Sequence, residues 1–289
     1  MNVQKSLLVG FVALFIFSCK KTDTGNGTIT ISAKTILNVS YGPDPLQVMD
    51  IYLPANRSIT KTKVLVMIHG GAWISGDKTD FAAAVDTLKN RLPDYALFNI
   101  NYRLSNGVSN IFPTQENDVK DAVRYIFAKS GDYLVSNKFV LLGASAGGHL
   151  AMLQGYKDSI PVKPKAIVSF FGPSDLVDMY LNPVGGNPLL TLTLSQAIGK
   201  TLIQDPALYF NSSPINFIRP TSAPTILLHG GLDPLVSPAQ SSNVKTRLSL
   251  FGVINQYVLY PTGGHGNWDT NTYTDAFNKI QAFLTANVQ

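Results

Sequence analysis

The pattern of hydrophobic and polar positions predicts strands and helices that follow one another along most of the chain. Apolar, largely β-branched runs predict buried strands at 63–68, 95–102, 138–142, 166–171, 225–229 and 256–260. Apolar residues at helical spacing predict helices at 81–92, 117–128, 239–250 and 274–286. A further helix is expected to follow the strand at 138–142 and to run through 154. Two earlier runs, bounded by turn residues, predict antiparallel strands at 36–41 and 47–53. We therefore expect an α/β fold with a mostly parallel central sheet and helices on both faces.

Residues 174–224 interrupt this alternation. They contain six prolines and no pair of strand and helix that continues the pattern. We expect a short cap-like insertion over the carboxyl ends of the strands, where sheets of this class bind ligands.

Composition limits the class of protein. Of 289 residues, 45% are hydrophobic, which excludes a largely disordered chain, and only 14% are charged, which leaves a surface of mostly uncharged polar groups. We expect one domain over 34–289. The net charge of +5 comes from scattered basic residues with no run beyond Lys20 and Lys21, so we expect no nucleic-acid partner.

The N-terminal segment has the features of an export signal. Lys5 precedes an apolar stretch of about 11 residues, shorter than the ~20 that cross a membrane. Cys19, the single cysteine, follows two residues after this stretch, and the segment resembles a bacterial lipoprotein signal. We expect a signal over 1–18, a lipid on Cys19, a flexible tether over 19–33 and an exported protein anchored to a membrane. The alternative is an ordinary signal peptide with an incidental cysteine.

A candidate nucleophile lies in the sequence Gly143-Ala144-Ser145-Ala146-Gly147. This is G-x-S-x-G between a predicted strand and a predicted helix, which places the serine on a sharp turn above the sheet. Glycine and alanine fit there because larger side chains would collide at such a turn. The alternative is a tight turn built from small residues.

A serine hydroxyl needs a base, and the base needs an acid that orients it. In this type of fold the chain order is serine, acid, histidine. Of the four histidines only His265, in a glycine-rich loop after the last strand, has the right position. The acid must be an aspartate, because the single glutamate precedes Ser145. Asp233 directly follows a strand and is the first choice, and Asp175 is the second.

The last requirement is a pair of backbone N–H groups for the developing oxyanion. The segment His69-Gly70-Gly71-Ala72 follows the strand at 63–68, where such a loop is expected. We predict an oxyanion hole formed by Gly70, Gly71 and Ala146. A glycine-rich turn alone is the alternative.

These motifs, in this order, resemble the α/β-hydrolase family. The branch that they resemble carries a His-Gly-Gly loop and includes carboxylesterases similar to hormone-sensitive lipase, bacterial feruloyl and acetyl-xylan esterases, and arylformamidases. Further stretches that resemble this branch are Met49 to Pro54, Gly76-Asp77-Lys78, Asn101-Tyr102-Arg103-Leu104, and Phe112-Pro113 with Asp118. The resemblance implies a serine esterase that acts on small esters or carbohydrate ester groups. An arylformamidase, a peptidase or a non-catalytic surface binding protein are the alternatives.

Three further residues are candidates for contact with substrate: Trp73, Asp175 and Trp268, which fall near predicted strand ends or in the insertion. Asp175 could instead cap a helix. We expect neither cofactor nor metal, because the chain lacks both H-E-x-x-H and paired cysteines.

Overall fold

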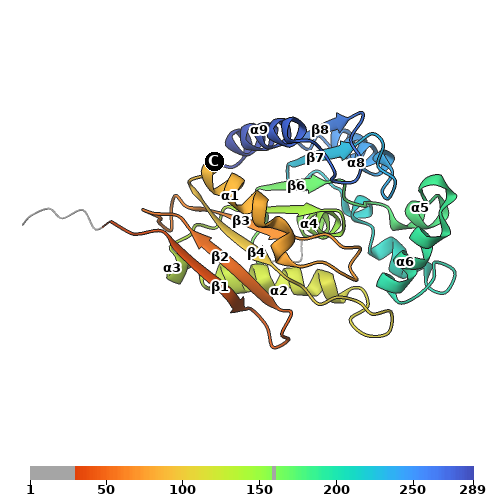
Figure 1. The fold of residues 1–289 in the computed structure, drawn as a ribbon, viewed down its shortest axis with the longest axis horizontal. Coiled ribbons are helices and arrows are strands. Elements are labelled where there is room, and N and C mark those ends of the chain that lie inside the picture. Colours follow the sequence, from red (N-terminus) through yellow and green to blue (C-terminus); the bar gives the residue numbers. More distant parts are fainter. Residues whose placement is uncertain (1–29, 158–160) are drawn as a thin grey trace, which may run out of the picture. The chain divides into compact units, whose positions relative to one another are not determined.

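An eight-stranded sheet forms the centre of the molecule (Figure 1). The structure is a computed structural model and describes residues 30–157 and 161–289. The predictions for the signal, for Cys19 and for most of the tether therefore lie outside the described residues. The strands are β1 (Lys34–Ser40), β2 (Val48–Leu53), β3 (Lys63–Ile68), β4 (Tyr95–Ile100), β5 (Phe139–Ala144), β6 (Ala166–Phe170), β7 (Thr225–Gly230) and β8 (Asn255–Tyr260).

The strand order is β1-β2-β4-β3-β5-β6-β7-β8. The pairs β1–β2 and β2–β4 are antiparallel, and every other neighbouring pair is parallel. This confirms the predicted α/β-hydrolase fold with a mostly parallel sheet. The strand from 95 ends at Ile100 rather than at 102. The backbone N–H of Asn101 still donates to the carbonyl oxygen of Val48, while its side chain accepts the backbone N–H of Lys78. The hydroxyl of Tyr102 donates to the carbonyl oxygen of His69.

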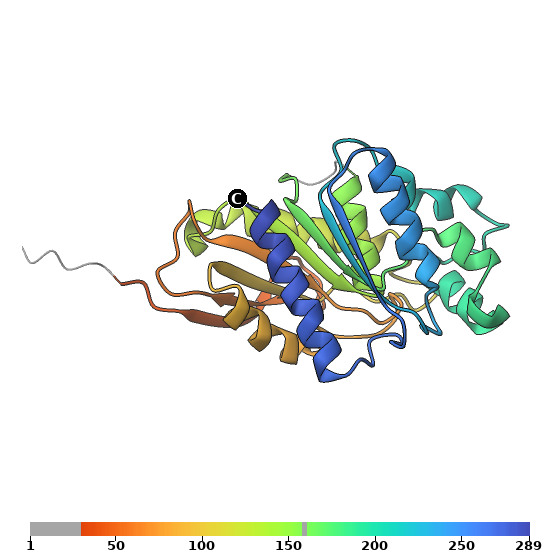
Figure 2. The same ribbon diagram turned by 90° about the horizontal axis from the view of Figure 1, so that it is seen from above.

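Helices cover both faces of the sheet. They are α1 (Ala82–Arg91), α2 (Thr114–Ala128), α3 (Ser130–Tyr133), α4 (Ala146–Tyr156), α5 (Leu176–Leu181), α6 (Pro188–Ile198), α7 (Pro206–Asn211), α8 (Pro238–Leu250) and α9 (Thr270–Asn287). Figure 2 shows α1 and α9 on one face and α2, α4 and α8 on the other. Helix α2 begins three residues earlier than predicted, because its first turn is polar and carries no hydrophobic period.

The insertion at 174–224 contains α5, α6 and α7, and Figure 1 shows α5 and α6 beyond the carboxyl end of β6. We did not predict these helices from the sequence, because prolines usually interrupt a helix. Instead Pro188 and Pro206 stand in the first turn of α6 and α7, where proline is tolerated because its missing N–H has no intrahelical partner.

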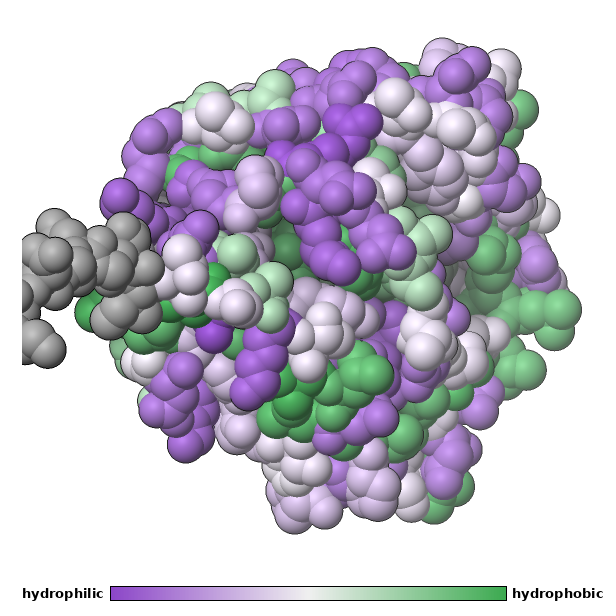
Figure 3. Space-filling model, turned by 60° about the vertical axis from the view of Figure 1, so that its left-hand side comes forward, coloured by the Kyte–Doolittle hydropathy of each residue, from purple (hydrophilic) through white to green (hydrophobic). Residues whose placement is uncertain are grey.

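Two hydrophobic clusters hold the layers together, one on each face. One joins the sheet to α2, α4 and α8, and the other joins it to α1 and α9. Strands β4 and β7 are buried along their whole length, which explains their continuous apolar sequences. Figure 3 shows one side of the surface, where hydrophilic residues predominate and a compact hydrophobic group lies in the lower half. Among the described residues, no helix is both long and apolar enough to cross a membrane.

Candidate active site

Ser145 stands between the end of β5 and the start of α4, with φ 54° and ψ −121°. Non-glycine residues rarely adopt this conformation, and it costs about 1–3 kcal/mol. The turn can form because its neighbours are small: a Cβ on Gly147 would lie 1.9 Å from the carbonyl oxygen of Ile68. The backbone N–H of Ser145 donates to the carbonyl oxygen of Phe170 at 2.9 Å, which ties the turn to β6.

The structure brings the three sequence-predicted residues Ser145, His265 and Asp233 into one hydrogen-bonded chain. Nε2 of His265 lies 2.9 Å from Oγ of Ser145, and Nδ1 lies 2.7 Å from Oδ2 of Asp233. Because the ionised carboxylate can only accept, Nδ1 carries the proton and Nε2 is free to accept from the serine hydroxyl. This arrangement is able to remove the proton of Ser145.

Asp233 is held as a carboxylate. Burial alone would raise its pKa, but hydrogen bonds from His229, His265 and the backbone N–H of Val236 outweigh burial and hold the pKa well below its usual range. The second oxygen accepts the N–H groups of Leu235 and Val236 at 2.8 and 2.9 Å. Asp233 is therefore charged at neutral pH and fixed in orientation.

His229 is a neighbour of this carboxylate that the sequence did not single out. Its Nε2 lies 2.9 Å from the carbonyl oxygen of Val236 and 3.4 Å from Oδ2 of Asp233, and its Nδ1 lies 2.7 Å from Oγ of Ser241. The side chain is fully buried. His229 thus braces the loop that carries Asp233. The sequence feature that could have pointed to His229 is its position at the end of a predicted strand, four residues before Asp233.

The loop that carries His265 is held by aromatic side chains. The indole N–H of Trp268 donates to the carbonyl oxygen of Gly264 at 2.8 Å, and the hydroxyl of Tyr273 donates to that of Gly266. The ring of Phe171 lies 4.5 Å from the His265 ring. Trp268 is 8% exposed and its indole N–H holds the loop, while its contact with substrate stays a prediction.

The loop after β3 is fixed through its carbonyl groups. Nδ1 of His69 lies 2.7 Å from the carbonyl oxygen of Gly70, and the hydroxyl of Tyr102 donates to the same oxygen at 3.1 Å. Burial lowers the pKa of His69, so its ring is neutral. Gly70 lies against the serine, because a Cβ there would be 3.3 Å from Cβ of Ser145. Gly71, with φ 102°, has no room for a side chain beside the carbonyl oxygen of Ser75.

Trp73 and Asp175 also have structural contacts, and their contact with substrate stays a prediction. Trp73 is 3% exposed and donates its indole N–H to Nδ1 of His149 at 3.3 Å. Asp175 begins α5, where its carboxylate accepts the N–H groups of Val177 and Asp178, as the capping alternative predicted. It takes no part in the Ser145–His265–Asp233 chain.

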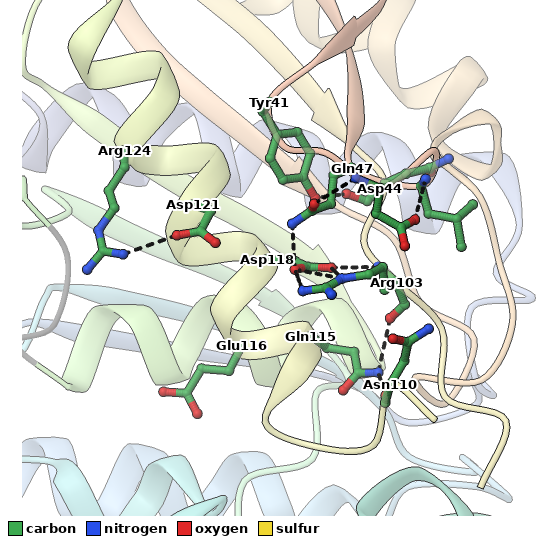
Figure 4. Close-up of polar contacts among 12 residues, drawn as sticks. Tyr41, Asp44, Gln47, Arg103, Asn110, Gln115, Glu116, Asp118, Asp121 and Arg124 are labelled. Carbon is green, nitrogen blue, oxygen red and sulfur yellow. Dashed lines mark hydrogen bonds and ion pairs between the residues drawn. The ribbon is translucent and has the colours of Figure 1, made fainter. Parts of the chain in front are cut away.

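A second polar cluster supports the segment after β4 (Figure 4). The carboxylate of Asp118 on α2 is fully buried and accepts from Arg103 through both the guanidinium, at 2.6 Å, and the backbone N–H, at 2.8 Å. It also accepts from Nε2 of Gln47 at 2.9 Å. Two residues further on, the N–H of Ser105 donates to the carbonyl oxygen of Trp73. The cluster therefore connects α2 to the loop that carries Gly70 and Gly71.

A groove of about 520 Å³ adjoins the serine turn. Its lining includes Gly70, Ala144, Phe171 and Gly266, all of which neighbour Ser145 or His265. Among residues 30–157 and 161–289, no group of three or more His, Cys, Asp or Glu residues is arranged to hold a metal ion.

Comparison with known proteins places the chain in a family. The BD-FAE family model matches residues 49–248. Esterase LipC of Mycobacterium tuberculosis (strain ATCC 25618 / H37Rv) is 25% identical over 241 residues, which are 79% of this chain and 59% of the relative. The probable isoprenylcysteine alpha-carbonyl methylesterase ICMEL1 of Arabidopsis thaliana is 25% identical over 257 residues, 83% of this chain and 51% of the relative. The chain thus spans a little over half the length of these relatives.

Solved structures show the same fold. A truncated carbohydrate esterase from gut microbiota has a TM-score of 0.71 and 25% identity, and the match covers 87% of this chain and 96% of the other. An acetyl ester-xyloside bifunctional hydrolase from Caldicellulosiruptor lactoaceticus has a TM-score of 0.71 and 20% identity, with 90% and 98% covered. By fold and by the extent of the family match, the chain belongs to the BD-FAE family of α/β-hydrolases.

Proposed function

We propose that this protein is a serine hydrolase that cleaves carboxylic esters. The observation that carries the proposal is the hydrogen-bonded chain from Ser145 through His265 to Asp233, with distances of 2.9 and 2.7 Å. Relatives of similar sequence are esterases. The arrangement has the order and contacts that acyl transfer by a serine requires.

In this proposal Ser145 Oγ attacks the acyl carbon while His265 Nε2 takes its proton. The resulting imidazolium is stabilised by the Asp233 carboxylate, and its proton passes to the leaving alcohol. The backbone N–H groups of Gly70, Gly71 and Ala146 bind the negative oxygen of the tetrahedral intermediate. Water, activated by the same histidine, then attacks the acyl-enzyme and releases the acid.

Ester groups on carbohydrates are the proposed substrates. Support comes from the likeness to a carbohydrate esterase at 25% identity and from a surface with few charges. The proposed substrate is thus an uncharged, polar saccharide that carries an acyl group.

Covalent labelling tests the proposed nucleophile. A fluorophosphonate reacts with an activated serine, so we expect the intact mass to rise by one phosphonyl group, located on Ser145 by peptide mapping. The Ser145→Ala variant should stay unlabelled, while Ser130→Ala, which changes a serine at the start of α3, should label like the natural protein. Equal labelling of Ser145→Ala would contradict the assignment.

We further propose, from the sequence alone, that Cys19 is lipidated after removal of residues 1–18 and anchors the protein to a membrane. The single cysteine at the end of an apolar stretch of about 11 residues supports this. Expressed in a bacterium, the natural chain should sediment with membranes and Cys19→Ser should be released to the soluble fraction. Membrane association of both to the same extent would contradict the anchor.

A further inference from the structure

The carboxylate of Asp233 faces two imidazole rings, and the proposed mechanism uses only one of them. Its Oδ2 lies 2.7 Å from Nδ1 of His265 and 3.4 Å from Nε2 of His229. Its other oxygen, Oδ1, accepts the backbone N–H groups of Leu235 and Val236. The side chains of His229 and Asp233 are fully buried, so bulk water does not reach the contact between them.

The surroundings of His229 determine which of its ring nitrogens carries a proton. Nε2 lies 2.9 Å from the carbonyl oxygen of Val236, and this oxygen and the carboxylate of Asp233 can only accept. Nε2 therefore carries a proton, and its N–H lies between a near acceptor on Val236 and a more distant one on Asp233. Nδ1 lies 2.7 Å from the buried hydroxyl of Ser241, which fixes the plane of the ring.

The groups around this ring come from several elements. Helix α8 contributes the hydroxyl of Ser241, and the end of β6 contributes Phe171, whose ring centroid lies 6.5 Å from that of His229. His265, which follows β8, lies across the carboxylate. Within residues 30–157 and 161–289, Asp233 is the acidic residue that pairs with His229.

We propose that His229 is a positioning residue for ester hydrolysis: its Nε2–H holds Oδ2 of Asp233 in place for His265 and limits the negative charge that this oxygen presents. The inference rests on the proposed serine hydrolase function. Donors on both carboxylate oxygens fix the carboxylate in one orientation, so the N–H of His265 meets its acceptor in one geometry. A donor on Oδ2 also shares the electron density that would otherwise stabilise the protonated base.

Loss of this donor has two consequences that a general loss of packing does not have. The carboxylate is less well fixed, so kcat falls while KM, which depends on groups that bind the ester, changes little. The oxygen facing His265 also carries more negative charge. The base then keeps its proton to higher pH, and the acidic limb of the rate profile moves in that direction.

Hydrolysis of p-nitrophenyl acetate between about pH 5 and pH 9 tests the inference. His229→Leu should lower kcat about tenfold, leave KM within about twofold and raise the midpoint of the acidic limb by about 0.5 pH unit. His229→Gln keeps an N–H donor and does not titrate, so it should restore kcat to within about threefold and the midpoint to that of the natural protein.

Ile226→Ala is the control for lost packing. Ile226 lies on β7 three residues before His229, is fully buried, and packs on the face of the sheet that α1 and α9 cover. This variant should lower the free energy of unfolding but leave kcat and the midpoint unchanged.

A measurement on the natural protein avoids any effect of a substitution on folding. A two-bond ¹H–¹⁵N spectrum near pH 7 should show a proton on Nε2 of His229, whose signals are identified by their loss in His229→Gln. Nε2 without a proton would overturn the inference. So would natural kcat and midpoint in His229→Leu, a His229→Gln variant that loses as much as His229→Leu, or an equal shift in Ile226→Ala.

Failure of the proposed function is recognised separately. The natural protein itself would then neither cleave the ester nor react with a fluorophosphonate, and both proposals would be overturned. Failure of the role of His229 alone leaves the natural protein active and reactive.

Discussion

Ser145 combines backbone strain with the side chain that we propose as the nucleophile. Its strained φ and ψ are held by the hydrogen bond to Phe170 and by the lack of space around Gly147. A set of neighbours this tight fixes Oγ in front of His265 before any substrate arrives. Such preorganisation is the main means by which a site of this kind lowers the barrier to acyl transfer.

His149 gives a pH-dependent prediction at the residue scale. It is fully buried, accepts from Trp73 and lies 2.7 Å from the carbonyl oxygen of Ser212, and burial lowers its pKa to about 3. Below about pH 6.5 the unfolded chain therefore binds a proton at this residue that the folded chain does not. This group costs stability as pH falls, by about 1.4 kcal/mol per unit until the folded pKa is reached.

Urea unfolding at pH 7 and pH 5 measures this effect. We expect the natural protein to lose about 2 kcal/mol more than His149→Gln over that interval, since the variant lacks the titrating group. Equal losses in the two proteins would show that His149 is protonated in the folded state.

The residue types and their order predicted the site residues that the structure brings together. Ser145, Asp233 and His265 have distinctive sequence positions, each at or after the end of a strand. The contacts of Trp73 and Trp268 could not be predicted, because an aromatic residue near a strand end can either face a ligand or hold a loop. Only the partner of the indole N–H distinguishes the two, and that partner, His149 or Gly264, is set by tertiary structure.

At the scale of the element, α2 offers a comparison of two aspartates. Asp118 is fully buried and accepts from several donors, whereas Asp121, three residues away, forms an exposed ion pair with Arg124 (Figure 4). Asp118→Ala leaves Arg103 and Gln47 without their acceptor and should cost about 3 kcal/mol. Asp121→Ala should cost less than about 0.5 kcal/mol.

The free energy of unfolding in urea, measured for both variants, checks this difference. The segment after β4 also contacts Trp73, so Asp118→Ala should lower kcat for ester hydrolysis as well. Similar stabilities of the two variants would mean that the buried cluster does not hold this segment.

The accuracy of the predicted elements follows their burial. Strand β3 was predicted with its observed bounds, because five of its six residues are buried and apolar. The helices of the insertion, α5, α6 and α7, were not predicted. Their stability comes from packing against the rest of the fold and from N-terminal capping residues such as Asp175 and Asp205. A short helix with a mixed surface carries little periodic signal.

At the scale of the whole molecule, the parallel sheet assembles the site. Ser145 and His265 are 120 positions apart in the sequence. The carboxyl ends of the parallel strands β5 and β8 nevertheless lie on the same side of the molecule, with β6 and β7 between them. The alternation of strands and helices predicted that the site lies at these carboxyl ends. It could not predict the groove between α1 and α9, which depends on how two helices from opposite ends of the chain pack on one face.

The most direct measurement of the central claim is hydrolysis of p-nitrophenyl acetate and hexanoate by the natural protein and by Ser145→Ala. The serine mechanism predicts saturable turnover by the natural protein and a loss of at least a thousandfold in kcat for both esters in the variant. Retention of more than a few per cent of the activity in Ser145→Ala would contradict the assignment of Ser145 as the nucleophile.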